Sequence, residues 1–66
     1  MKNLEIIEGN YNGHVNAYDY AYANNRDYML EYEKGYLDAI EYVLGKLGVE
    51  YKINTAGYIT IEQEAN

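Results

Sequence analysis

The side chains that could take part in catalysis are few and poorly arranged for it. The chain has no Ser and no Cys, so Thr55 and Thr60 supply its only aliphatic hydroxyl groups. A nucleophile needs an adjacent base, and the only obvious base is His14, whose position suits a surface or helix-start residue. Glu31 and Glu33 form a carboxylate pair, but acid–base chemistry needs a pocket that so short a chain is poorly able to build. We therefore expect no enzymatic activity.

Metal and cofactor sites are equally poorly supplied. With no Cys and only one His, the chain cannot build a zinc site from Cys or His ligands. Gly9 and Gly13 lack the spacing and the Lys-Ser/Thr end of a phosphate-binding loop. The stretch Asn10-Tyr11-Asn12-Gly13 has too few carboxylates for a calcium loop. We expect no metal and no cofactor.

One group of acidic residues has a spacing that could serve binding. On a helix, Asp27, Glu31 and Asp38 fall within about 40° of one another, and Glu41 lies beside them. The rises along the row are about 6 Å and about 10 Å, similar in scale to phosphate spacing along DNA. A basic groove shaped for phosphates could accept such a row. The other interpretation is an ordinary solvated helix face, since Lys34 interrupts the row and can pair with Asp38.

Tyrosine is the second unusual feature, because the chain has 10 Tyr and neither Phe nor Trp. Tyrosine combines a large apolar ring with a polar tip and is common in binding hot spots. Tyr42, together with Tyr20 and Tyr28, lies outside the apolar stripes and is a candidate for partner contact. Three others fit a role in the core: Tyr18, Tyr22 and Tyr36. The candidate partner-binding set is therefore Asp27, Glu31, Asp38, Glu41 and Tyr42.

The element that must position this set is a long amphipathic helix over Arg26–Leu47. Asn24 can cap its start, and Lys46 in the last turn followed by Gly48 is a typical helix end. Glu33 is out of place, because it falls on the apolar stripe. That stripe comprises Met29, Tyr36, Ile40, Val43, Leu44 and Leu47.

The remaining segments predict an α+β fold in one small domain, 1–66. Leu4–Glu8 has the alternation of a strand, and Val15, Tyr18 and Tyr22 fit a short helix. Asn12-Gly13 is also a strong hairpin signal, so residues 14–23 could instead form a strand. Val49–Glu62 predicts a C-terminal β-hairpin packed on the long helix. The expected order is strand, short helix, long helix and hairpin, with a frayed tail over 63–66.

Size and charge limit the function further. A chain of 66 residues buries a small core, and disulfides are unavailable to stabilise it. We therefore expect a homodimer, because one short hairpin would leave part of the helix's apolar surface exposed. The net charge of −6 repels nucleic acid and attracts basic surfaces. No apolar run is long enough to span a membrane and no signal peptide is evident, which predicts a cytoplasmic protein.

This combination of size, acidity, Tyr and Asn richness and the Asp27–Glu31–Asp38–Glu41 row resembles small acidic host-takeover proteins of phages that infect low-GC bacteria. The resemblance is in composition over the whole chain and includes no diagnostic motif. That class includes DNA mimics. The resemblance therefore implies that this chain is a non-enzymatic inhibitor that occupies the DNA-binding surface of a basic host protein such as the nucleoid protein HU. Other members inhibit CRISPR effectors, uracil-DNA glycosylase or RNA polymerase. The competing expectation is a Tyr-rich adaptor that binds a partner protein without imitating DNA.

Overall fold

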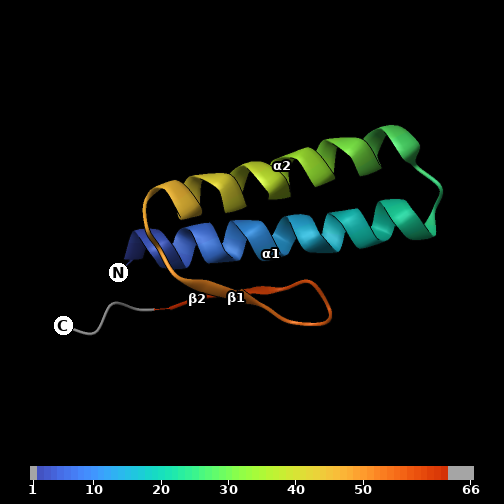
Figure 1. Cartoon of the computed structure of the whole chain (residues 1–66). Coiled ribbons are helices and arrows are strands. Elements are labelled where there is room, and N and C mark those ends of the chain that lie inside the picture. Colours follow the sequence, from blue (N-terminus) through green and yellow to red (C-terminus); the bar gives the residue numbers. More distant parts are fainter. Residues whose placement is uncertain (1, 63–66) are drawn as a thin grey trace.

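The chain folds as two helices followed by a β-hairpin. The computed structural model describes residues 2–62, with α1 over Lys2–Ala23, α2 over Asp27–Lys46, β1 over Tyr51–Ile53 and β2 over Ile59–Ile61. The helices run antiparallel, and α1 is the middle layer between α2 and the hairpin (Figure 1). The α+β class is thus confirmed. The prediction for residues 63–66 lies outside the described residues.

The N-terminal part differs from the prediction. Leu4–Glu8 is not a strand, and residues 14–23 are not a separate short helix, because α1 is continuous over 22 residues. The physical reason is a helical period that runs through the expected turn: Leu4, Ile7 and Tyr11 continue it into Val15 and beyond. Packing of this face outweighs the cost of the two glycines in the helix, about 1 kcal/mol each.

The second helix confirms the prediction to within one residue at each end. Its start is not capped as expected, because Arg26 occupies the N-cap position without a side-chain hydrogen bond. Asn24 instead completes α1, where its side-chain amide donates to the Tyr20 carbonyl. At the other end Gly48 has φ +73°, and its N–H and that of Val49 bond back to carbonyls of the last turn. This is the glycine-terminated helix end that the sequence predicts.

The hairpin forms where it is expected but packs on a different helix. Tyr51 pairs with Ile61 and Ile53 with Ile59 in an antiparallel register. The loop is closed by the Asn54 side chain, whose Oδ1 accepts the N–H groups of Ala56 and Tyr58. The hairpin lies against α1, on the side away from α2 (Figure 1). The expectation that it covers α2 is wrong, since the unforeseen length of α1 already supplies α2 with its packing partner.

Polar side chains of α1 fix the hairpin in place. The Asn12 amide donates to the Ile59 carbonyl at 3.1 Å and accepts the Ile59 N–H at 2.7 Å. One turn earlier, Glu8 accepts the Ile61 N–H at 3.0 Å. These bonds satisfy backbone groups on the outer edge of β2, which would otherwise be open to another strand. The buried apolar core joins all three layers: Tyr11, Val15, Leu44, Ile59 and Ile61.

A polar pair also crosses between the helices. Glu33 is only 5% exposed, and its carboxylate lies 2.5 Å from Nδ1 of His14 on α1. The His14 ring in turn stacks on Tyr36, with ring centroids 3.7 Å apart. The misplaced charge on the apolar stripe is therefore accommodated by a partner on the other helix, and a buried carboxylate needs such a partner. The imidazole that sequence reasoning placed at the surface has a structural role.

Candidate functional site

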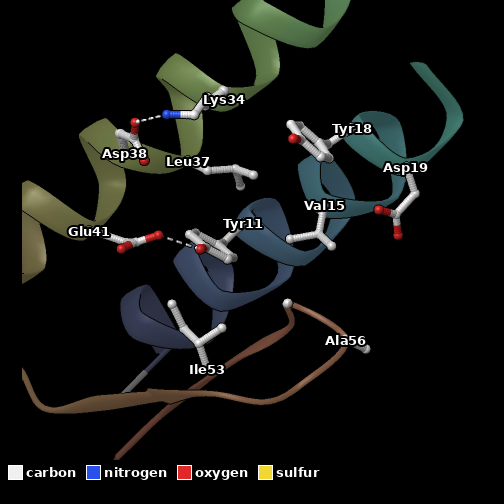
Figure 2. A pocket seen from close by; sticks show the side chains of 11 residues that line it. Tyr11, Val15, Tyr18, Asp19, Lys34, Leu37, Asp38, Glu41, Ile53 and Ala56 are labelled. Atoms are coloured by element: carbon white, nitrogen blue, oxygen red, sulfur yellow. Dashed lines mark hydrogen bonds and ion pairs between the residues drawn. The ribbon is translucent and has the colours of Figure 1, made fainter. Parts of the chain in front are cut away.

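The candidate site is a groove over α1 that is lined by side chains from both helices and the hairpin. It lies between α2 and the hairpin loop and has a volume of about 270 Å³. Figure 2 shows side chains from all three elements around it, with Leu37 directed from α2 toward α1 and Ile53 directed from the hairpin toward the same space. The lining residues are Tyr11, Val15, Tyr18, Asp19, Lys34, Leu37, Asp38, Glu41, Ile53, Ala56 and Gly57.

The groove has an apolar floor because α1 presents its helical stripe here. Val15 and Tyr11 are buried in the core and form the deepest part, while Tyr18 and Leu37 are half-buried. Gly57 forms the loop beside this floor with φ +94°, a backbone conformation that favours glycine. An added Cβ would lie 3.6 Å from Val15 Cγ1, an ordinary contact distance, so the backbone conformation and not a lack of space calls for glycine. The hairpin loop therefore forms one wall and α2 forms the other.

The rim of the groove is mainly acidic. Asp38 and Glu41 lie on the α2 side of the groove, and Asp19 lies on α1. The ammonium group of Lys34 is the one positive charge among the residues that line the groove. Lys34 Nζ is 3.5 Å from Asp38 Oδ2, and both side chains are about two-thirds exposed. An exposed pair of this kind contributes roughly 0–1 kcal/mol and is readily exchanged. The rim thus keeps a negative charge that an incoming cation can engage.

Glu41 is held at the groove by Tyr11. The Tyr11 hydroxyl donates to Glu41 Oε2 at 2.6 Å (Figure 2). Burial raises the pKa of Tyr11 well above its usual range, and the hydrogen bond and the negative charge of Glu41 raise that pKa further. Tyr11 therefore stays protonated at neutral pH and orients the carboxylate.

The predicted partner-binding residues are only partly brought together. Asp38 and Glu41 line the groove, whereas Asp27 and Glu31 lie at the start of α2 beside a second hollow. Lys34 lines both hollows, so its ammonium group interrupts the acidic row between Glu31 and Asp38. Glu41 is half-buried, so the interpretation of the row as an ordinary solvated helix face does not hold for this carboxylate. Its partner, Tyr11, lies 30 positions away in sequence.

The tyrosines separate into two groups. Tyr42 is exposed and does not line the groove; the Lys46 ammonium lies 5.5 Å from its ring centroid. Tyr20 and Tyr28 are exposed as expected, Tyr28 to 92%. Tyr22, assigned to the core from its spacing, is 70% exposed and that assignment is wrong, since it lies in the last turn of α1. Tyr18 and Tyr36 are half-buried.

Sequence reasoning missed the floor of the groove. No helix was predicted over Tyr11, and Ile53 was predicted only as part of the hairpin. The signal that could have found Tyr11 is its spacing from Val15 and Tyr18, which continues the stripe of one helix rather than starting a new one. Nothing local to the sequence indicates that the hairpin loop meets this stripe.

The described part of the chain contains no group of three or more His, Cys, Asp and Glu side chains able to hold a metal ion. Between residues 2 and 62, no helix is both long enough and apolar enough to cross a membrane. The comparisons with known proteins find no matching family model, no similar curated protein and no similar solved structure.

Proposed function

We propose that this chain is a non-enzymatic acidic binding protein of the cytoplasm that occupies a basic surface of a partner protein by imitating DNA. The observation that carries the proposal is the row of four carboxylates along α2, in which Asp27 and Glu31 are exposed and Asp38 and Glu41 border an apolar groove. The first target to test is HU, the basic nucleoid protein suggested by the resemblance in composition.

The spacing of the carboxylates supports this proposal. The helical rise places Asp27 and Glu31 about 6 Å apart along the axis and Asp38 about 10 Å further on. Lys and Arg side chains that bind phosphates would form charge-assisted hydrogen bonds with such carboxylates. The net charge of −6 on 66 residues would steer a basic partner toward this face. Tyr42 would add apolar contact at the border of the face.

The proposal includes a homodimer, but the exposed residues that support it differ from those expected from the sequence. The long apolar side of α2 is covered by α1, but Val43 and Leu47 remain 48% and 67% exposed. Ile6, near the start of α1, is 60% exposed. The start of α1 and the end of α2 lie at the same end of the antiparallel pair (Figure 1). Exposed aliphatic residues gathered at one end are typical of an interface. A twofold contact there would set two acidic surfaces in a fixed relation.

The second candidate function is a Tyr-rich adaptor without mimicry. It is favoured by the exposure of Tyr28, Tyr32 and Tyr42 and by the apolar floor of the groove, which DNA mimicry does not require. Salt distinguishes the two functions. Charge-driven binding weakens steeply as the ionic strength rises, whereas apolar binding changes little.

The test is displacement of a labelled DNA duplex from HU by this protein, at low and at high salt. The proposal predicts that HU leaves the duplex at low salt and that much more protein is needed at high salt. If HU stays on the duplex at a large excess, HU is the wrong target. If a pull-down from a bacterial lysate then recovers no other basic DNA-binding protein, mimicry is wrong and the adaptor function takes its place.

A further inference from the structure

We infer that the groove between α2 and the hairpin loop receives an amphipathic cationic segment of the partner protein, with an aliphatic side chain on its floor and a Lys or Arg at its rim. The inference rests on the proposed function, because it specifies the chemistry that a basic partner must present at this part of the acidic surface. It adds an apolar anchor that the carboxylate row by itself does not require.

The size and lining of the floor fit an aliphatic side chain. A volume of about 270 Å³ is below the ~300–1,000 Å³ typical of small-molecule pockets. It exceeds the ~150 Å³ left when one large aliphatic side chain is removed from a core. Val15, Leu37 and Ile53 supply branched aliphatic walls, and the Tyr11 ring completes the floor. One or two aliphatic side chains from another protein would therefore fill the groove.

The rim supplies the charge complement. Glu41 accepts the Tyr11 hydroxyl with Oε2, and a carboxylate has about four acceptor positions, so it can also accept from an incoming cation. Asp38 shares only an exposed contact with Lys34, which a Lys or Arg of the partner can replace. A cation here would neutralise charge while its aliphatic stem lies on the apolar floor.

This combination selects one class of occupant. The negative field repels nucleic acid, and a purely polar polycation would leave the apolar floor uncovered. A protein segment that alternates aliphatic and basic residues satisfies both parts of the site. The groove is open to solvent, so side chains projecting from a partner helix can enter it without unfolding either protein.

Two synthetic peptides test the inference by NMR titration of the intact chain. One carries leucines at helical spacing between lysines, and the other carries serine in place of every leucine. The leucine peptide should shift the amide signals of Val15, Leu37 and Ala56. The serine peptide should bind at least about tenfold more weakly, the difference expected for one buried leucine. Equal affinity of the two peptides would overturn the inference, because it would leave charge as the only attraction.

A pair of charge-matched variants tests the rim. D38N/E41Q and E5Q/E50Q each remove two carboxylates, but Glu5 and Glu50 are exposed and lie outside the groove. Gln at 41 keeps an acceptor for Tyr11. The leucine peptide should bind D38N/E41Q several-fold more weakly than E5Q/E50Q. Equal weakening of both variants would contradict the inference, and the two-peptide comparison on the unaltered chain decides the matter if D38N/E41Q does not fold.

The outcome is independent of HU displacement. If the protein displaces DNA but does not bind the leucine peptide, the inference about the groove is wrong and the proposal of DNA mimicry is unaffected. If the protein binds the leucine peptide but does not displace DNA, the inference about the groove is supported and the groove serves the adaptor function instead. If the groove signals shift with protein concentration alone, a second copy of this chain occupies the groove and the inference is wrong.

Discussion

The acidic residues inside this molecule and those on the outer face of α2 differ in what they contact. Glu33 lies against His14, Glu41 accepts from Tyr11 and Glu8 accepts a strand N–H, so each inner carboxylate joins α1 to another element. Asp27 and Glu31 are exposed on the surface that runs along α2.

The negative charge of the chain therefore has two roles, one in folding and one in binding, and the amino-acid composition does not distinguish the residues that serve each. Inner carboxylates specify how the helices and the hairpin are arranged, because a buried charge is tolerated only where a partner meets it. Outer carboxylates contribute little to folding and are available for a partner protein. The two sets should therefore respond differently to mutation: Glu8 and Glu33 through stability, Asp27 and Glu31 through binding, and Glu41, which also lies at the groove rim, through both.

The largest expected effect is loss of the buried pair between the helices. His14→Ala should lower the free energy of unfolding by about 3 kcal/mol, because it leaves the Glu33 carboxylate buried without its partner. Urea denaturation followed by circular dichroism measures this. The double variant H14L/E33L should recover most of the loss, since an apolar pair avoids burying a charge. A loss below about 1 kcal/mol in H14A would mean that the pair contributes little to the fold.

A smaller effect is expected at the edge of the hairpin. Asn12→Ala removes two hydrogen bonds to Ile59 and should cost about 1–2 kcal/mol. Asn10→Ala is the matched control, because Asn10 is an exposed residue of the same helix and the gain in helix propensity is similar. Hydrogen exchange of the Ile59 amide should be faster in N12A alone. Equal stability of the two variants would show that the contact does not hold the hairpin.

The hydrogen bond of Tyr11 predicts a dependence on alkaline pH. The folded-state pKa of Tyr11 is raised above its unfolded value near 10, so its contribution to stability is complete below about pH 10 and is lost as the pH rises toward the folded-state pKa. The unfolding free energy should therefore fall less steeply above about pH 10 in Tyr11→Phe than in the unaltered protein. Identical slopes in the two proteins would contradict the assignment.

The fold was predictable where the signal is local. The 3.6 period of α2, its end at Gly48 and the alternation of the hairpin strands are all contained in short stretches of sequence. The segment Leu4–Glu8 was misassigned because five residues fit a strand and a helix equally well. Only the continuation of the stripe through Asn12-Gly13 identifies α1, and there tertiary packing overrides a strong turn signal.

The candidate site was predictable only in part, because it depends on contacts between distant segments. Asp27, Glu31 and Asp38 are exposed as the helical spacing predicts. Glu41 belongs to the groove because Tyr11 reaches it from another helix, and no pattern within α2 indicates this. The floor of the groove likewise requires α1 and the hairpin loop to meet, which the wrong assignment of the N-terminal third concealed.

The smallest effect on stability is expected on the outer face. D27N/E31Q should change the free energy of unfolding by less than about 0.5 kcal/mol, since both side chains are exposed and Asp27 adds only a few tenths at the start of the helix. Urea denaturation beside E5Q/E50Q checks this at equal net charge. A loss of unfolding free energy as large as that of N12A would show that Asp27 and Glu31 also stabilise the fold, and the distinction between inner and outer carboxylates would then be wrong.

Displacement of a labelled duplex from HU by D27N/E31Q and by E5Q/E50Q distinguishes binding through the α2 carboxylates from binding through total charge. Both variants have the same net charge, so they differ only in where the carboxylates were removed. E5Q/E50Q should displace the duplex nearly as well as the unaltered protein, whereas several-fold more D27N/E31Q should be needed because its partner-facing row is broken. Equal displacement by the two variants would contradict this expectation, because total charge rather than the surface of α2 would then determine binding.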